Sequence, residues 1–462
     1  MDRPRVLSSS VTTSIYTCTS QDIRDQHNSD SRKKFHNIFE TPKIPASLRL
    51  TCTMTDKVFQ LSGSCNNYPW GKQGRKSLAA QLKVRTDKDF EIKDDEYYSE
   101  LWFGDYPDFP ARVLETGELL KDVLDKNKEA LLGKKVISEL GGQLPFLPKI
   151  LSIAKALPLQ IHPNKGLAAE LHASDPENFT DPNHKPEIAV ALSEFEVFAG
   201  FKPLNKISPL FNLPALHPFV PANTTHWTDS TLREVVRNLL KADEVDIHGI
   251  IKVLTQTRHE IFVDIDAVYI LDLLPRLQEQ YGPHDAGILV ALTCMNFMTL
   301  HPGEAIYIPA DGIHAYLSGN IVECMARSNN VLNSGFCPPA DRNSIDMFAD
   351  TLTFGAHSVE DVMLRNQRSG RSKEGRTVVY KPPMSEFDML KTSLKGGEWD
   401  LIAPGEGPGV MIVTQGKGKM RASSDGGEKE FELSEGFIFF VAPGVGVKLE
   451  TEAGMQVHMA VL

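Results

Sequence analysis

Two stretches in the C-terminal half of the chain share one pattern of turns and apolar runs. Leu300–Ile308 and Leu433–Val441 each place a Gly-containing turn before an apolar run. A second turn follows each run, Asp311-Gly312 in the first stretch and Pro443-Gly444 in the second. An internal repeat of turn, strand, turn and strand at short spacing is typical of a jelly roll. The repeat therefore predicts two related β-domains in one chain.

The two copies align without gaps, but they differ at one position with chemical meaning. Gly303 falls on Gly436, whereas His314 falls on Val447. An imidazole can ligate a metal ion, and a valine side chain cannot. We therefore expect a metal site in the first copy only, and a metal-free, structural second copy.

The segment 202–293, which precedes the first copy, has helical periodicity. Apolar residues recur there at i, i+3, i+4, i+7 and i+8: Leu232, Val235, Val236, Leu239 and Leu240. Thr231-Leu-Arg-Glu234 fits a capping box, and the apolar run 267–274 is expected to end at Pro275. Another helix is predicted at 118–124. The predicted fold class is mainly β with α: two cupin-like jelly-roll domains plus a helical subdomain.

Composition limits the class of protein. The 462 residues are 41% apolar and 24% charged, which is ordinary for a globular chain with two or three cores. A net charge of −11 argues against a nucleic-acid partner. No apolar run has the ~20 residues of a membrane span, and the six cysteines lack the spacing of a disulfide framework. We expect a cytoplasmic protein without a membrane partner, either a monomer or a weak homo-oligomer.

Candidate metal ligands lie in two short stretches and at His314. Gln160 and His162 are two residues apart, so an extended strand would point both to one face. Glu187 opens the apolar run 188–192 after a Pro-rich turn. Two imidazoles, an amide oxygen and a carboxylate suit a divalent metal such as zinc. A single His on a strand is more often a core or surface residue, so the spacing alone leaves both interpretations open.

Longer motifs favour the metal site. They are Asn67–Lys72, Glu100–Gly104, Leu144–Leu151, Gln160–Lys165, Asp181–Glu187 and His314–Gly319. Together they resemble the type I mannose-6-phosphate isomerases, in the family's order from about residue 54 to the C-terminus. The resemblance implies a zinc-dependent aldose–ketose isomerase that interconverts mannose 6-phosphate and fructose 6-phosphate and feeds GDP-mannose synthesis. It implies a small-molecule sugar phosphate as partner, and one Zn²⁺ per chain held by Gln160, His162, Glu187 and His314.

The resemblance also implies roles for residues around the metal. The expected catalytic residues are Lys185, Glu323 and Tyr316, the last of which would share a strand face with His314. The expected substrate-binding residues are Lys149, Lys185, Trp70 and Arg327. Four of them have a simpler interpretation. The two lysines could be solvated surface charges, Glu323 could form a local salt bridge, and Trp70 could be a packing anchor.

Combined with the resemblance, the patterns divide the chain into five parts. Residues 1–53 lack helical or strand period and are expected to be disordered, with Met54 as the expected start and 1–53 as a doubtful prefix. Residues 54–201 and 294–365 would form the zinc-binding catalytic cupin domain, with the helical subdomain 202–293 inserted in it. Residues 366–376 are polar and basic and are expected to be an exposed linker. Residues 377–462 would form the metal-free cupin-like domain.

The chain departs from the family pattern around the expected substrate site. Asn333 stands at the usual catalytic Arg position, Asn329 at a usual Asp, Pro339 at a usual Lys and Pro158 at a usual Ser. An amide cannot replace the charged, five-donor guanidinium. Arg327, six residues before Asn333, and Arg342 are the candidates that could compensate.

Three hypotheses follow from these departures. The first, which we adopt, is a working mannose-6-phosphate isomerase with a modified phosphate clamp. The second is a zinc-binding paralogue with weak or no isomerase activity, acting as a sensor or partner-binding protein. The third is a cupin isomerase for another sugar. All three retain the metal ligands, so the zinc content would not separate them. A substrate screen would.

Overall fold

The computed structural model describes residues 56–384, 386–424 and 427–462. The expectations for residues 1–53 and for Met54 lie outside the described residues. No described helix combines the length and the apolar character needed to span a bilayer. The observed class is mainly β with helices, as predicted from the sequence.

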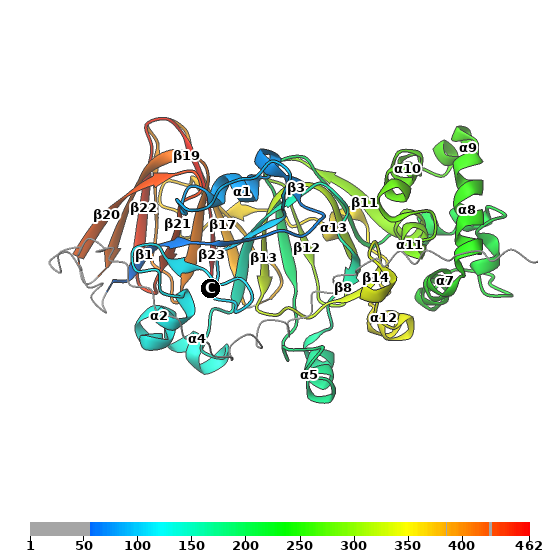
Figure 1. The fold of residues 1–462 in the computed structure, drawn as a ribbon, viewed down its shortest axis with the longest axis horizontal. Helices are drawn as coiled ribbons and strands as arrows, with labels where there is room; N and C mark the ends of the chain where they lie inside the picture. Colours follow the sequence, from blue (N-terminus) through cyan, green and yellow to red (C-terminus); the bar gives the residue numbers. More distant parts are fainter. Residues whose placement is uncertain (1–55, 385, 425–426) are drawn as a thin grey trace, which may run out of the picture. The chain divides into compact units, whose positions relative to one another are not determined.

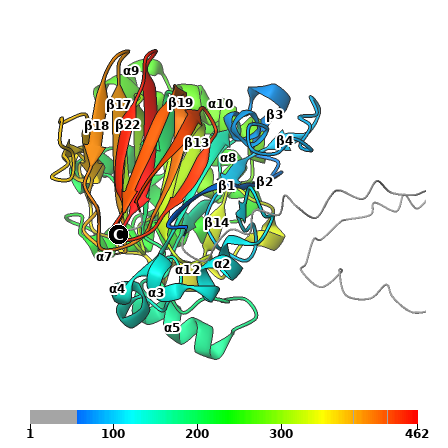
Figure 2. The same cartoon turned by 90° about the vertical axis from the view of Figure 1, so that its left-hand side faces the viewer.

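Within the described residues, an 11-stranded sheet takes up most of the C-terminal part of the chain. Its strands are β1 (Val58–Ser62), β6 (Arg112–Val113), β15 (Gln367–Arg368), β16 (Thr377–Tyr380), β17 (Asp388–Leu394), β18 (Trp399–Ile402), β19 (Gly409–Ser424), β20 (Gly427–Ser434), β21 (Ile438–Val441), β22 (Gly446–Glu450) and β23 (Met455–Val461). The main path is β15-β16-β17-β23-β19-β21-β1-β6, with β20 and β22 on β19, and β18 on β22. Figure 2 shows the paired strands β19 and β22 running alongside each other.

A 10-stranded sheet of the described residues carries the candidate site. Its strands are β2 (Ser64–Asn66), β5 (Glu100–Trp102), β7 (Phe146–Ile153), β8 (Leu159–Ile161), β9 (Glu187–Ala191), β10 (Phe195–Phe201), β11 (Met295–Leu300), β12 (Ala305–Ile308), β13 (His314–Ala326) and β14 (Leu332–Gly335). The long strand β13 pairs with β7, β8, β9 and β10, so it connects the elements that carry the predicted ligands. The short strands β3 (Lys72–Gln73) and β4 (Tyr97–Tyr98) pair in a separate two-stranded sheet.

The helices fall into two groups. Those of the first part are α1 (Leu78–Lys83), α2 (Leu120–Lys126), α3 (Lys128–Leu132), α4 (Lys134–Glu139) and α5 (Lys165–Ser174). Those of the helical subdomain and after it are α6 (Leu204–Ile207), α7 (Asp229–Lys241), α8 (Glu244–Gln256), α9 (His259–Asp264), α10 (Tyr269–Tyr281), α11 (Ala286–Cys294), α12 (Ile345–Thr351) and α13 (Val359–Val362). Short 3₁₀ turns lie at Gly74–Lys76, Leu210–Asn212, His217–Phe219 and Pro339–Asp341.

The helical subdomain is inserted between two neighbouring strands. β10 ends at Phe201 and β11 begins at Met295, and these two residues pair with each other across the ladder. The chain therefore leaves and re-enters the sheet at one point, as Figure 1 shows for the helices α7–α11. Their core is continuous with the sheet, because it includes Leu159 and Ile161 on one face of β8.

The sequence patterns predicted helices where the structure has them, but the ends of these helices differ from the prediction. All five residues of the predicted apolar face on α7 are buried. The N-cap is Thr228 rather than Thr231. The Thr228 side chain accepts a hydrogen bond from the Thr231 backbone N–H, and the side chain of Thr231, the third helical residue, accepts one from the Thr228 backbone N–H. Helix α10 continues through Pro275 to Tyr281, because Leu273, Leu274 and Leu277 are buried on both sides of the proline. Burial of that apolar face outweighs the backbone hydrogen bond that Pro275 cannot donate.

The sequence repeat corresponds to equivalent turns in the two sheets. Gly303 and Gly436 both have left-handed φ angles, +92° and +87°. The next turns repeat this feature at Asp311 (φ +59°) and Gly444 (φ +76°). Val447, at the position that corresponds to His314, is buried in the apolar core of the C-terminal sheet. Among the described residues of this sheet, no three His, Cys, Asp or Glu side chains lie close enough together to hold a metal ion.

Two segments near the predicted boundaries take part in the C-terminal sheet. Strand β1 pairs with β21 and β6, so the first strand of the expected catalytic domain lies in the C-terminal sheet. The expected exposed linker 366–376 contains β15 and is anchored to the sheet. Ser372 and Thr377 donate hydrogen bonds to the buried carboxylate of Asp400, at 2.5 and 2.7 Å. Most of the segment is exposed, as its polar composition suggested, and the buried Ser372 is satisfied by the Asp400 carboxylate.

Candidate metal centre and cavity

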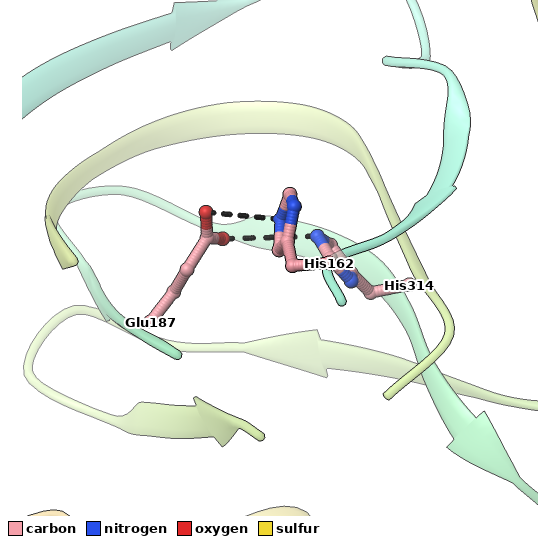
Figure 3. Close-up of side chains that lie close together, drawn as sticks. All are labelled: His162, Glu187 and His314. Atoms are coloured by element: carbon pink, nitrogen blue, oxygen red, sulfur yellow. Dashed lines mark ion pairs between the residues drawn. The ribbon is translucent and has the colours of Figure 1, made fainter. Parts of the chain in front are cut away.

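Three buried side chains from separate strands meet at one point. His162 directly follows β8, Glu187 opens β9 and His314 opens β13. Their ligand atoms all lie within 4.8 Å of one another. His162 Nε2 is 3.2 Å from Glu187 Oε1, and His314 Nε2 is 3.7 Å from Glu187 Oε2. Figure 3 shows both imidazoles directed at the carboxylate.

Local pairing explains why these residues converge. Glu187 pairs with Ile308 at the end of β12, and the chain returns six residues later at His314. The intervening turn is fixed to the first ligand, because Asp311 donates its backbone N–H to the His162 carbonyl at 2.6 Å. His314 then pairs with Gln160 across β13 and β8. Gln160, the fourth predicted ligand, thus lies beside the triad in the ladder.

The hydrogen bonds of the two imidazoles fix their tautomers. Nδ1 of His162 donates to the Asn330 carbonyl at 2.8 Å, and Nδ1 of His314 donates to the Gly312 carbonyl at 3.0 Å. Burial lowers the pKa of His162 to about 3 and also lowers the pKa of His314, so both rings are neutral. Each Nε2 then carries a lone pair, and both Nε2 atoms are buried without a hydrogen-bond donor.

This arrangement fits a divalent cation. Lone pairs that face a carboxylate oxygen would repel it unless a positive charge lies between them. Two ligands at zinc–ligand distance in tetrahedral geometry are about 3.4 Å apart, close to the 3.2 and 3.7 Å observed. Lys185, 3.5 Å from Glu187, helps to keep this carboxylate ionised: burial would raise the pKa of Glu187, but the charge of Lys185 opposes this, and the pKa lies well below its ordinary value.

A cavity of about 450 Å³ opens beside the triad. Among the predicted site residues it is lined by Trp70, Lys149, Gln160, Lys185, Glu187, Glu323 and Asn333. His162 and His314 are fully buried and do not line the cavity themselves, but they contact Glu187, which does. The hydroxyl of the buried Tyr316 donates to Glu187 at 3.1 Å. Trp70 both lines the cavity and stacks on Tyr68, so it combines the two interpretations open for it.

Lys149 and Glu323 face each other on paired strands. Lys149 Nζ is 3.3 Å from Glu323 Oε2 and 3.7 Å from Glu100 Oε1, and it lies 4.3 Å from the Trp102 ring centroid. Burial, followed by the charge of Glu187, raises the pKa of Glu323 to about 8. For Lys149, burial would lower the pKa, but the carboxylates outweigh it and raise the pKa above its ordinary value. Glu323 is thus a carboxyl that can exchange a proton near neutral pH.

The remaining predicted residues are engaged elsewhere. Arg327 is paired with the buried Asp105 and lies over the Tyr106 ring, and it is not among the residues that line the cavity. Arg342 pairs with Asp285 at 3.0 Å. Neither guanidinium occupies the place that Asn333 leaves in the cavity wall. Pro158 and Asn329 line the cavity, whereas Pro339 lies in an exposed 3₁₀ turn.

Two residues of the site were missed by sequence reasoning. Glu100 lines the cavity, and its Oε2 accepts from Asn66 and Trp102 at 2.7 Å each. The signal was available, because Glu100 opens a buried strand in which a free carboxylate would be costly. Asn330 orients His162 through its carbonyl, and no sequence pattern marks a residue that acts through its backbone.

Comparison with known proteins agrees with this description. The family model for the catalytic domain of type I phosphomannose isomerase matches residues 58–204, and the model for the family's C-terminal domain matches residues 377–425. The mannose-6-phosphate isomerase of Candida albicans is 34% identical over 87% of this chain and 97% of its own length. That of Saccharomyces cerevisiae is 35% identical over 86% of this chain and 97% of its own length.

Solved structures show the same fold at lower identity. The apo mannose 6-phosphate isomerase of Salmonella typhimurium superposes with a TM-score of 0.71 at 24% identity, covering 88% of this chain and 99% of its own. A mannose 6-phosphate isomerase bound with zinc and yttrium gives 0.71 at 24% identity, covering 87% and 99%.

Fold and site together define a metal-binding enzyme of the cupin class. The fungal relatives, which this chain matches over 97% of their length, show the family within this class. This chain belongs to the type I phosphomannose isomerase family.

Proposed function

We propose that this protein is a zinc-dependent aldose–ketose isomerase that interconverts mannose 6-phosphate and fructose 6-phosphate, and that in this role it supports GDP-mannose synthesis. The relatives that bear the name mannose-6-phosphate isomerase support the substrate pair. The zinc of a structural neighbour supports the choice of metal.

One observation carries the proposal. Two neutral imidazoles, each oriented by a backbone carbonyl, direct unpartnered Nε2 atoms at one carboxylate in the wall of a cavity. A buried set of this kind has no structural purpose without a cation. His162, Glu187, His314 and Gln160 would hold one Zn²⁺ per chain. The bound ion would polarise the sugar oxygens at C1 and C2 as a Lewis acid.

The chain's own groups supply the proton chemistry. The reaction moves a proton between C2 and C1, so it needs a group that accepts and returns a proton near neutral pH. We assign this step to Glu323, because it lines the cavity and its pKa is raised to about 8. Lys149, 3.3 Å away, stabilises the carboxylate once the proton has left. Lys185 faces the cavity beside Glu187 and is placed to donate to a sugar oxygen. Tyr316 acts as a positioning residue, because its hydroxyl holds Glu187.

The test is turnover of mannose 6-phosphate by the purified, zinc-loaded chain, measured as fructose 6-phosphate formed. We expect Glu323→Gln, which keeps the shape and removes the proton acceptor, to lower kcat by about 10²–10⁴-fold. The exposed Glu115→Gln is the matched control and should retain full activity. No product from the zinc-loaded protein, or equal kcat for Glu323→Gln, would refute the proposal.

A further inference from the structure

A second cavity is lined mainly by the C-terminal sheet. Its volume is about 700 Å³, and it shares no lining residue with the cavity beside the metal centre. Four short segments of the sheet and its turns form most of the wall, at 394–396, 415–417, 434–435 and 453–456. Arg85, which follows α1, completes the wall from the N-terminal part of the chain. The cavity thus lies where these two parts of the chain meet.

The wall of this second cavity has an excess of positive charge. Its charged lining residues are Arg85, Lys395, Lys417 and Glu435, so the cations outnumber the carboxylates by two. The chain as a whole carries a net charge of −11. A concave cluster of cations on an acidic protein raises the local concentration of anions.

The three cations of the wall are free to bind a ligand. Among the described residues, no hydrogen bond, ion pair or ring contact reaches the charged ends of Arg85, Lys395 and Lys417. All three residues are exposed, so an anion from solution can reach them. An incoming anion would therefore not have to displace a carboxylate of the protein.

A neighbouring lysine on the same strand shows the opposite arrangement. Lys419 lies across the β19–β20 ladder from Glu432 and pairs with it at 3.2 Å. Lys417, two residues earlier on the same face of β19, lies across from Ser434. The ladder thus supplies a counter-charge for one lysine and leaves the lysine at the cavity without one.

Two glycines fix the backbone that carries these cations. A Cβ at Gly436, where φ is +87°, would lie 2.8 Å from the Cβ and Cγ of Arg85. The missing side chain therefore lets the stem of Arg85 lie against the turn between β20 and β21. Gly416, where φ is +79°, allows the carbonyl of Gly454 to approach where a Cβ would clash with it. The charged ends are free, but their attachment points are held by close packing.

The uncharged lining groups add hydrogen-bond donors. The amides of Gln415 and Gln456 and the hydroxyl of Ser434 line the cavity, and such groups donate to phosphate and sugar oxygens. Guanidinium and ammonium groups are the preferred partners of phosphate. The volume lies in the range of cavities that hold small molecules. An excess of two positive charges matches a phosphate group that carries two negative charges.

We propose that this cavity is a second ligand site, which binds a phosphorylated metabolite through a group of two negative charges. A phosphate monoester and the diphosphate of a nucleotide sugar both supply such a group. The ligand joins Arg85 of the N-terminal part to Lys395 and Lys417 of the C-terminal sheet. This inference does not depend on the proposed isomerase activity, because the two cavities have no lining residue in common.

Calorimetric titration of the full chain tests the inference. AMP carries a phosphate monoester, ADP-glucose carries a diphosphate diester, and adenosine is the uncharged control. We expect at least one phosphorylated probe to bind with a Kd below about 1 mM, and adenosine to bind at least about tenfold more weakly. Binding of AMP alone would assign the site to monoesters, and binding of ADP-glucose alone would assign it to nucleotide sugars. Binding of neither, or equal binding of adenosine, would overturn the inference.

Substitutions on the wall locate the binding. Lys417→Gln and Arg85→Gln should each weaken it by about tenfold, since each removes a charge-assisted hydrogen bond. Lys419→Gln removes the same charge from the same strand, but this lysine is already paired with carboxylates, so its effect should be about twofold or less. Glu435→Gln removes the carboxylate of the wall and should strengthen binding. Unchanged binding in Lys417→Gln, or an equal loss in Lys419→Gln, would overturn the assignment to this cavity.

Discussion

At the scale of single residues, the cavity depends on a small network of buried charges. Lys149 lies between Glu100 and Glu323, and Lys185 beside Glu187, so each lysine compensates carboxylates that are almost fully buried. Removing one partner of such a group costs more than the pair itself contributes, because the remaining charge stays buried. The network holds Glu323 and Glu187 in place for their separate tasks.

The first prediction concerns Lys149. Lys149→Met should destabilise the fold by about 3–5 kcal/mol, because Glu100 and Glu323 would share one buried site without a cation. The free energy of unfolding from urea titration measures the change. Lys135→Met, on the exposed face of α4, is the control, with an expected change within about 0.5 kcal/mol. Equal stabilities of the two variants would show that the network contributes nothing.

The sequence motifs contain the residues that the structure brings together. His162, Glu187 and His314 lie within reach of one metal ion, and Gln160 lies beside His314 in the ladder. Arg327 could not be placed, because its partner Asp105 is 222 residues away in the sequence and no spacing rule connects them. The sequence also gives no sign of which lysine is already paired with a carboxylate.

At the scale of elements, the junction of the helical subdomain with the sheet has a buried charge of its own. Lys202 follows the last residue of β10 and is 8% exposed. Its Nζ donates to the Tyr269 hydroxyl on α10 and to the Leu292 carbonyl on α11, the latter at 3.2 Å. Burial lowers the pKa of Lys202 to about 8, and the hydrogen bonds of its Nζ go to a hydroxyl and to backbone carbonyls.

The second prediction is a pH dependence that follows from this junction. An unfolded lysine has a pKa of about 10.4, so between pH 8 and 10 the unfolded chain binds a proton that the folded chain does not. Stability conferred at Lys202 therefore rises with pH in this range. Relative to Lys202→Met, the unmodified protein should gain about 2 kcal/mol of unfolding free energy between pH 7 and pH 10. A constant difference across this range would contradict the lowered pKa.

The sequence predicted the type of the helices better than their first and last residues. The apolar face of α7 was correct, because helical periodicity and burial report the same physics. The cap at Thr228 was missed, since two threonines three apart can form the same box without the Glu or Gln the motif usually has. The anchoring of 366–376 depends on Asp400, a residue 24 positions beyond that stretch. A polar segment alone does not reveal such a partner.

At the scale of the whole described chain, the two sheets share one core. A single apolar cluster contains Ile150 of the 10-stranded sheet and Met411 of the 11-stranded sheet, and Phe146 contacts Phe387 edge to face. Strand β1 adds a backbone connection, since it enters from the N-terminal side and pairs with β21. The sequence repeat predicts two domains, but it could not show that the two sheets share one interior.

The third prediction follows from the shared core. Thermal unfolding should show one transition, and Ile150→Ala and Met411→Ala should each lower its midpoint, at a cost of about 2–5 kcal/mol. Both residues are fully buried, so the two variants are matched in exposure. Calorimetry and near-UV circular dichroism report on the transition. Two separate transitions, each sensitive to one variant, would show that the sheets unfold independently.

The central claim is that His162, Glu187 and His314 hold a metal ion on which isomerisation depends. The most direct test strips the purified protein with a chelator and titrates zinc back while fructose 6-phosphate formation from mannose 6-phosphate is followed. We predict no turnover in the stripped protein, recovery that saturates at one zinc per chain, and neither zinc uptake nor recovery in His314→Ala. Full turnover by the stripped protein, or saturation unchanged in His314→Ala, would contradict the account.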